Sequence, residues 1–514
     1  MATKNEMGRK FKDQLHQFST KQWTQDYQTR NTSNKALMNC DVAPKKTRRK
    51  YVTHWANLPD ILLERIFSHL TIRERFYASL VCKTWNRAFY LPNVWSRFVL
   101  EDTTLTRARF NYYQGWQYVL DHVRTQLCLT QIGSYIRCLI FAPMLNFFNL
   151  YEFIKLLSWY IEQGDNPLLN SFGIGSRIRT LKFTFPCNMD NRIRDEDEIT
   201  KLYGTGGQIL GTLKRLMTNL PELQQLELID LMLEIKEAQH LLDGVCNICC
   251  TSMRTLVLIN TTRYQYPLLH VGVFLNLKVL VISPQNLGDD VLELLGSTQL
   301  QHLHIHQNVY TPDYVMNYTT VRAWKNCKRD NPYLQVHLEM ENLKEKRLLL
   351  WPAAPVTSII YDSPHIGVQL AEVMNMVEHY KDSLRVYGHK SLPRGYRSKK
   401  FYDRIDESLV LLGRGCPKLQ TLIITERVST ATLLLIATTC KNLQNLYVRR
   451  NAVIKKFDWQ VNPNWSDEYA EWLKCAAHDY SRIENEISQI LGYKWCMMSD
   501  RAFGKLQLDF DELN

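Results

Sequence analysis

A short apolar phrase recurs along most of the chain. It consists of an often small or apolar residue followed by x-x-Leu-x-x-Leu, and commonly by one variable and one further apolar residue. Three copies keep a cysteine: Cys250-x-x-Met253-x-x-Leu256-x-Leu258, Cys416-x-x-Leu419-x-x-Leu422-x-Ile424 and Cys440-x-x-Leu443-x-x-Leu446-x-Val448. Looser copies occur at Ile136/Leu139/Phe141, Ile178/Leu181/Phe183, Leu223/Leu226/Leu228, Leu277/Leu280/Ile282, Leu300/Leu303/Ile305 and Leu334/Val336/Leu338. The Leu-x-Leu spacing places both side chains on one face of a short strand.

The spacing between copies indicates a stacked repeat. Leu256, Leu280 and Leu303 lie 24 and 23 residues apart, and Leu422 and Leu446 lie 24 apart. This is within the period of roughly 20 to 29 residues of repeats that alternate a strand with a helix. The intervals before Leu226 are longer, so we expect long insertions or longer helices there instead of a smooth horseshoe.

Helical segments fit between and after the predicted strands. Residues 289–295 carry two acids in their first turn, where they complement the helix dipole. Residues 430–439 are apolar, and from Ser466 the chain again has a helical period. The predicted fold is therefore α/β: a curved parallel sheet backed by helices forms an irregular solenoid over residues 101–456. Residues 457–514 form a helical cap with an acidic tail.

Residues 58–95 have a different pattern, with apolar residues at helical spacings. Pro59 suits the first turn of a helix, where its missing N–H group would have no partner. Thr71 and Glu74 have the spacing of a capping box, so a second helix begins there. So short a segment has too few neighbours to bury all its apolar residues, and part of this surface should be completed by another chain.

This segment resembles the F-box. The resemblance is carried by Leu58, Pro59, Leu62, Ile66, Phe67, Leu70, Val81, Cys82, Trp85 and Trp95. The acid often found third after the leading Leu is Ile61 here, and the acid is Asp60. An ordinary helical hairpin inside a larger core is the alternative interpretation.

The resemblance implies a function without catalysis. In the F-box family this segment, here residues 51–100, docks on the Skp adaptor through the ten residues just named. The adaptor is held by a cullin scaffold that recruits a RING subunit and a ubiquitin-conjugating enzyme. The apolar phrases resemble the cysteine-containing leucine-rich repeat that F-box receptors often carry, and the overall layout resembles F-box-only proteins with divergent repeats. The expected function is the substrate-recognition subunit of an SCF-type ubiquitin ligase.

Charge and cysteine content narrow the cellular setting. Residues 1–50 hold 12 Lys or Arg against 4 Asp or Glu, so this leader carries most of the net charge of +12, and we expect it to be disordered. Its basic cluster at 45–50 fits an import signal, an acid-binding segment or a solvated linker. No apolar run opens the chain, residues 136–161 read as core, and the thirteen cysteines favour reduced thiols. We expect an intracellular protein, nuclear or cytoplasmic, without a membrane span.

Several patterns of the sequence are candidate sites of chemistry. Cys246-x-x-Cys249-Cys250 lacks a second pair of zinc ligands, and no phosphate-binding loop is present, so we expect no metal, no cofactor and no enzyme activity. We expect Cys250, like Cys416 and Cys440, to be a buried repeat residue. His302, His304 and His306 share one face of a predicted strand, which we expect to be an exposed face, a metal-binding ladder being the alternative.

The basic and aromatic loop at 388–404 is the first candidate for target binding. Arg394, Tyr396, Arg397, Lys399, Lys400 and Phe401 are the residues expected to contact an acidic or phosphorylated protein target. A merely solvated loop is the alternative. Two other functions remain open: a scaffold that binds the Skp adaptor without joining a cullin, and a basic repeat protein that binds nucleic acid.

Overall fold

The computed structural model describes residues 54–112, 115–144, 146–164, 173–185, 207–312, 319–341, 347–364, 368–393 and 400–506. The chain divides into two compact units, Met1–Asn57 and Leu58–Asn514. In the first unit only a short 3-10 helix, η1 (His54–Asn57), is described. The basic leader 1–50 and its cluster at 45–50 therefore lie outside the described residues, and the expected disorder stays a prediction.

The second unit begins with three short helices, α2 (Asp60–Ser68), α3 (Ile72–Ser79) and α4 (Lys83–Phe89), followed by the 3-10 helix η2 (Pro92–Trp95). Pro59 is the N-cap residue of α2. The capping box predicted for α3 is present, because the Thr71 hydroxyl accepts from the Glu74 backbone and the Glu74 carboxylate accepts from the Thr71 backbone. The predicted helical segment is therefore confirmed, although Pro59 stands one residue before the first turn in which it was expected.

Twelve strands of the described residues form one parallel sheet, in the order in which they occur along the chain. They are β1 (Arg97–Leu100), β4 (Cys138–Phe141), β5 (Thr180–Thr184), β6 (Gln225–Ile229), β7 (Thr255–Ile259), β8 (Val279–Ile282), β9 (His302–Gln307), β10 (Gln335–Glu341), β11 (Val356–Asp362), β12 (Val386–His389), β13 (Thr421–Ile424) and β15 (Asn445–Val448). All nine apolar phrases of the sequence form strands of this sheet. The predicted α/β solenoid is confirmed.

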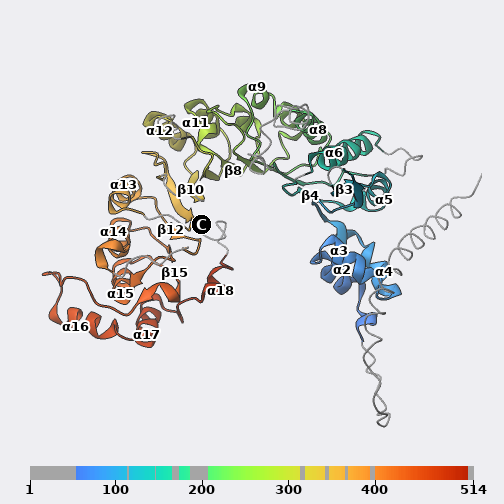
Figure 1. Cartoon of the computed structure of the whole chain (residues 1–514). Coiled ribbons are helices and arrows are strands. Elements are labelled where there is room, and N and C mark those ends of the chain that lie inside the picture. Colours follow the sequence, from blue (N-terminus) through green and yellow to red (C-terminus); the bar gives the residue numbers. More distant parts are fainter. Residues whose placement is uncertain are drawn as a thin grey trace, which may run out of the picture. The chain divides into compact units, whose positions relative to one another are not determined.

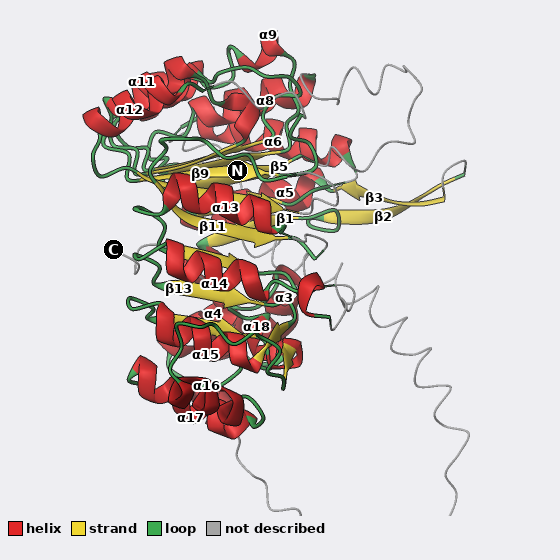
Figure 2. Cartoon of the chain, turned by 90° about the vertical axis from the view of Figure 1, so that its left-hand side faces the viewer, coloured by secondary structure: helices red, strands yellow, loops and turns green. Residues whose placement is uncertain are grey.

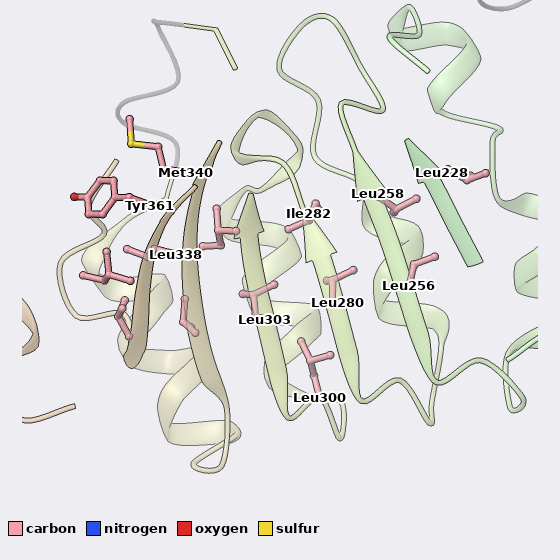
Figure 3. Close-up of a cluster of buried hydrophobic side chains, with 14 of the residues drawn as sticks. Leu228, Leu256, Leu258, Leu280, Ile282, Leu300, Leu303, Leu338, Met340 and Tyr361 are labelled. Carbon is pink, nitrogen blue, oxygen red and sulfur yellow. The ribbon is translucent and has the colours of Figure 1, made fainter. Parts of the chain in front are cut away.

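Leucines at equivalent positions of the phrase lie side by side across the sheet. Leu226 pairs in register with Leu256, Leu256 with Leu280, and Leu280 with Leu303. All four side chains are fully buried, and those of Leu256, Leu280 and Leu303 point to the same side of their strands (Figure 3). Because burying one Leu side chain stabilises the fold by about 1.5 to 3 kcal/mol, this ladder specifies the register of neighbouring strands.

Helices cover the leucine side of the sheet and follow one another in chain order (Figures 1 and 2). They are α5 (His122–Ile132), α6 (Phe147–Glu162), α8 (Gln208–Thr218), α9 (Ile235–Ala238), α10 (Asp243–Cys249), α11 (Asp289–Gly296), α12 (Val321–Asp330), α13 (Leu370–Tyr380), α14 (Asp406–Gly415) and α15 (Thr430–Thr439). Short 3-10 turns connect several of them: η3 (Gly133–Tyr135), η4 (Leu269–Val273), η5 (Pro284–Asn286), η7 (Phe401–Asp403) and η8 (Arg450–Ala452). Within the described ranges, no helix is long and apolar enough to cross a bilayer.

Two further pairs of strands lie outside this sheet. β2 (Thr106–Asn111) and β3 (Gly115–Leu120) form an antiparallel hairpin, and β14 (Val428–Ser429) pairs with β16 (Val453–Ile454). The large sheet itself begins at Arg97, inside the range 51–100 that was expected to belong to the F-box, because β1 pairs with β4. The hairpin was not predicted from the sequence.

The repeat cysteines do not all behave alike. Cys416 and Cys440 are buried as predicted, but the prediction for Cys250 is wrong, because its side chain is only half-buried. The backbone of Cys250 is still helical, with ψ −33°, whereas Cys416 and Cys440 have left the helix, with ψ 86° and 87°. Cys249 therefore takes the buried place, with its Sγ 3.3 Å from the carbonyl oxygen of Leu220.

The C-terminal residues form the predicted helical cap and then return over the sheet. α16 (Asp467–Ala476) and α17 (Tyr480–Leu491) are followed by an extended segment and by α18 (Asp500–Phe503). Met498 pairs with Arg449 in parallel, and Phe503 packs against Ile360, Val386 and Ile423. Ile360, Val386 and Ile423 alternate with the inward-facing residues of their strands. The C-terminal tail, here residues 498–506, therefore covers the sheet face that lies opposite the helices.

Candidate adaptor-binding surface

Helix α2 divides its apolar residues between an inner and an outer face. Leu63 and Phe67, one turn apart, are fully buried. Ile61, Leu62 and Ile66 lie on the other side of the helix and are 75%, 46% and 40% exposed. A surface helix of a monomeric domain normally turns such residues inward. The outer face of α2 is thus an apolar surface that nothing in the described chain covers.

Aromatic rings fix α2, α4 and η2 to one another from inside. The rings of Phe67 and Trp85 meet edge to face with their centroids 5.9 Å apart, and those of Phe89 and Trp95 are 5.0 Å apart. The indole N–H of Trp95 donates to the carbonyl oxygen of Phe89 at 2.6 Å. These contacts make the outer face rigid, which reduces the entropy lost when a partner binds.

A buried arginine closes the end of α2. The guanidinium of Arg75 donates to the carbonyl oxygens of Phe67, Ser68 and Leu70 at 2.9 to 3.1 Å, and it lies 5.1 Å from the centre of the Trp95 ring. The Phe67 carbonyl oxygen also accepts from the N–H of Leu70, and a cation complements the negative end of the helix dipole. Burial lowers the pKa of Arg75, with a smaller contribution from Arg97. Sequence reasoning missed this residue.

Two polar contacts on the surface join α2 to the segments after it. Asp60 forms an ion pair with Arg87 of α4 at 2.8 Å, and the Glu64 carboxylate accepts from the backbone N–H of Asn93 at 2.8 Å. Asp60 is the acid that stands one place before the position usual in the family. Because both partners of the ion pair are exposed, it contributes less to stability than to the orientation of α4.

The structure separates the ten predicted adaptor-binding residues into three groups. Pro59, Leu62, Ile66 and Val81 are exposed; Leu58, Leu70, Cys82 and Trp85 are half-buried; Phe67 and Trp95 are buried in the core. The exposed residues are accessible to a partner, whereas Phe67 and Trp95 support the surface from below. Leu80, which is 58% exposed, and Ile61 belong to the same exposed set and were not predicted. Binding of the adaptor by these residues stays a prediction.

The loop predicted to bind the target is described only in part. Arg394, Tyr396, Arg397 and Lys399 lie outside the described residues. Phe401 packs edge to face on Trp459 with the ring centroids 5.0 Å apart. The guanidinium of Arg404 lies 5.4 Å from the Phe401 ring and pairs with Asp406 and Asp458. Phe401 is therefore half-buried against its own chain, and Lys400 next to it is exposed.

The expectation that the histidine face of β9 is exposed is wrong. His302 and His304 are buried, and only 13% of the His306 side chain is exposed. Strand β10 lies in register beside β9 and brings His337 and Glu339 against them. The rings of His304 and His337 stack with their centroids 4.3 Å apart, and His304 Nδ1 lies 2.7 Å from a Glu339 oxygen.

Opposite charges stabilise the far end of this cluster. His306 Nε2 lies 3.0 Å from Glu341, and its Nδ1 lies 3.4 Å from Glu339. Burial alone would lower the pKa of His306, but these two hydrogen bonds outweigh it and raise the pKa to about 9. Burial and the neighbouring histidines lower the pKa of His337. Within the described residues, no group of His, Cys, Asp and Glu side chains is arranged to hold a metal ion.

Comparisons with known proteins agree on the N-terminal segment. The F-box domain family matches residues 55–97. F-box/LRR-repeat protein 21 of Bos taurus is 36% identical over 63 residues, and its counterpart in Mus musculus is 33% identical over 61 residues. Each match covers 12% of this chain and only 14% or 13% of the relative. Among solved structures, the crystal structure of the TLR13–ssRNA13 complex matches 45% of this chain and 36% of that one, with 12% identity and a TM-score of 0.21.

The residues matched by the family coincide with the elements that build the exposed apolar surface. α2, α3, α4 and η2 all lie within residues 55–97. The twelve-stranded parallel sheet that follows is built from the regularly spaced apolar phrases of the sequence. The chain therefore contains an F-box domain, followed by a solenoid sheet of the leucine-rich-repeat type.

Proposed function

We propose that this protein is the substrate-recognition subunit of an SCF-type ubiquitin ligase. The observation that carries the proposal is the outer face of the F-box, where Ile61, Leu62, Ile66, Leu80 and Val81 are exposed although the helices beneath them are tightly packed. In this proposal the Skp adaptor covers that face. Through the adaptor, the chain joins a cullin, a RING subunit and a ubiquitin-conjugating enzyme.

The receptor acts by proximity. Binding one target next to a ubiquitin-loaded enzyme raises the effective concentration of the target's lysines, and this does not require a catalytic group in the receptor. The solenoid sheet offers a long surface for a target, since each repeat contributes one strand to it. The cellular compartment follows as part of the proposal: the adaptor and the cullin are intracellular partners, in the nucleus or the cytoplasm.

A matched set of variants tests adaptor binding. Leu62 and Ile66 are 46% and 40% exposed, and Leu269 and Ile248 in the solenoid are 48% and 41% exposed. We expect Leu62→Ala with Ile66→Ala to lower adaptor affinity by about a hundredfold, because apolar anchors at the centre of an interface often contribute more than 1 kcal/mol each. Leu269→Ala with Ile248→Ala should leave it unchanged. Unaltered adaptor binding by a folded Leu62/Ile66 variant would rule out this surface.

Recovery of the intact chain from cells separates the receptor from the other candidate functions. Adaptor and cullin together support the ligase receptor. Adaptor without cullin supports a scaffold, and recovery that is sensitive to nuclease, with neither partner, supports a nucleic-acid-binding protein.

A further inference from the structure

The β2–β3 hairpin extends away from the large sheet and from the helices that cover it (Figure 2). The two strands pair antiparallel with each other, and in the described residues neither belongs to the twelve-stranded sheet. A two-stranded ribbon exposes both its faces and its outer edges, and edges with unpaired backbone groups are where additional strands bind.

One face of the hairpin is aromatic. Phe110 is directly opposite Trp116, and Ala108 is opposite Tyr118, so all four side chains point to the same side. Phe110, Trp116 and Tyr118 are 58%, 73% and 54% exposed, and the rings of Phe110 and Trp116 meet with their centroids 5.4 Å apart. Three adjoining exposed aromatic rings are unusual for a surface that only faces water, and aromatic side chains are enriched at interfaces.

The other face of the hairpin is basic. Arg107 and Arg109 alternate with the aromatic positions and are exposed. Residues 105–120 contain no Asp or Glu, so no acid of the hairpin offsets them. At the aromatic end, Arg73 of α3 donates to the hydroxyl of Tyr77 at 3.3 Å. This bond raises the pKa of Arg73.

A buried side chain holds the base of the hairpin in place. Asn149 of α6 is fully buried, its Oδ1 accepts from the N–H of Leu120 at 2.8 Å, and its Nδ2 donates to the carbonyl oxygen of Tyr118 at 2.8 Å. Asn146 donates to the same Tyr118 oxygen at 3.1 Å. An isolated two-stranded hairpin is marginally stable in water. The fold thus supplies buried polar contacts that keep this exposed ribbon ordered.

We propose that the hairpin binds an extended segment of a target protein in which acidic and apolar side chains alternate. Because Asn149 and Asn146 already bond the backbone of Tyr118 and Leu120 on the β3 edge, such a segment adds to the outer edge of β2 as a third strand. Its apolar side chains then lie beside the face of Phe110 and Trp116, and its acidic side chains lie beside Arg107 and Arg109. The inference rests on the proposed receptor function, because it names the class of target that the receptor would recognise.

The arrangement favours a polypeptide over single-stranded nucleic acid. Proteins that bind single strands place aromatic rings and cations along one groove, so that bases stack while phosphates are neutralised. Here the rings and the two arginines lie on opposite faces of the ribbon. A β-strand presents alternate side chains to opposite faces, so an acidic and apolar alternation matches both faces at once.

Peptide binding to the full-length chain tests the proposal. The probe is a fluorescein-labelled nine-residue peptide in which Glu alternates with Phe and Val, compared with peptides in which Gln or Lys replaces Glu. We expect the Glu peptide to bind most tightly and to weaken as salt is raised, because exposed charges are screened. Phe110→Ala with Trp116→Ala, and separately Arg107→Glu with Arg109→Glu, should each weaken it about tenfold or more. Tyr333→Ala, which removes an aromatic ring that is 85% exposed elsewhere, should not change it.

Adaptor affinity is measured on the same samples, so the two proposals fail separately. If the Leu62/Ile66 variant loses adaptor binding but still binds the peptide, the result bears only on the F-box surface. The hairpin proposal is overturned if the Gln or Lys peptide binds as well as the Glu peptide, or if the hairpin variants bind it normally. It is also overturned if the hairpin variants lose adaptor binding while they keep peptide binding, or if a uridine oligonucleotide binds the hairpin more tightly than the Glu peptide.

Discussion

The outer face of the F-box and the open face of strands β11–β13 are both apolar, but only the second is covered by its own chain. Ile360, Val386 and Ile423 would be exposed on the sheet if Phe503 did not pack on them. Ile61, Leu62 and Ile66 of α2 have no such cover in the described chain. Since burying apolar surface is the main stabilising contribution in both folding and association, the covered surface serves the fold and the uncovered one is suited to a partner.

The largest effect on stability is expected when the Phe503 ring, which covers the apolar face of strands β11–β13, is removed. Phe503→Ala is expected to lower the free energy of unfolding by about 3 to 5 kcal/mol, because it leaves a cavity among buried side chains. Urea denaturation measures it, and Phe148→Ala, at a ring that is 46% exposed, should cost less than about 0.5 kcal/mol. Adaptor binding should be unaffected. Equal stability of the Phe503 variant and the wild type would show that the tail does not cover the sheet.

The second-largest effect on stability is expected at Arg75, which is buried at the end of α2. Arg75→Met should destabilise the F-box by about 2 to 3 kcal/mol, because the carbonyl groups at the end of α2 lose a charged donor. Arg75→Lys keeps the charge but reaches fewer carbonyl groups, so its loss should be intermediate. Protection of the α2 and α3 amides from hydrogen exchange reports the change locally. Unchanged protection in the Met variant would mean that the aromatic core alone orders these helices.

On the face of the large sheet opposite the helices, strands β9 and β10 carry paired polar side chains around His306 and Glu339. The pH dependence of stability tests how much this pairing contributes. The pKa of His306 is raised from 6.5 to about 9, so its stabilisation is full below pH 6.5 and is lost as the pH rises through 9. His306→Gln should therefore be less stable than wild type by about 2 kcal/mol at pH 6.5, and the difference should shrink toward zero above pH 9. A difference that grows with pH would contradict this account.

The smallest effect on stability is expected at Ile61 and Leu80, two exposed residues that were not predicted to belong to the adaptor-binding surface. Ile61→Ala and Leu80→Ala should each change the free energy of unfolding by less than about 0.5 kcal/mol, because these side chains already face water. If a partner covers the face, each should nevertheless weaken adaptor binding about tenfold. Calorimetric titration with the adaptor measures this. A stability loss without a loss of affinity would assign both residues to the fold.

The pattern of apolar residues along each strand accounts for which strands were predicted from the sequence. The nine predicted strands carry apolar residues at alternate positions. The positions between them are less buried in β4, β5, β6, β7, β8 and β15 but buried as well in β9 and β13. β11 and β12 were missed because their sequences contain no Leu-x-Leu phrase, and β1 was missed because it lies in the range assigned to the F-box. The burial of the histidine face was missed because it depends on β10 lying beside β9, which the pattern of β9 alone does not reveal.

The candidate site was predictable to a similar degree. The spacing from Leu58 to Trp95 identified the first two helices and most of the apolar residues, but not α4 as a separate helix. It did not separate the inner from the outer residues, because that depends on where α4 and η2 pack. Arg75 could not be singled out from the sequence, because its role depends on the carbonyl groups that the end of α2 brings around it. The hairpin has no repeat phrase, and only its position beside α6 shows that it is held in place.

The order of the strands has a consequence for synthesis on the ribosome. Each strand of the large sheet pairs with its neighbours in the sequence, so every repeat can dock on the previous one as soon as it leaves the exit tunnel. Phe503 is the exception, because it closes on Ile360 from far along the chain. Until Phe503 has been synthesised, strands β11–β13 therefore keep an apolar face in water. We expect nascent chains that do not yet include Phe503 to depend on chaperones at this face.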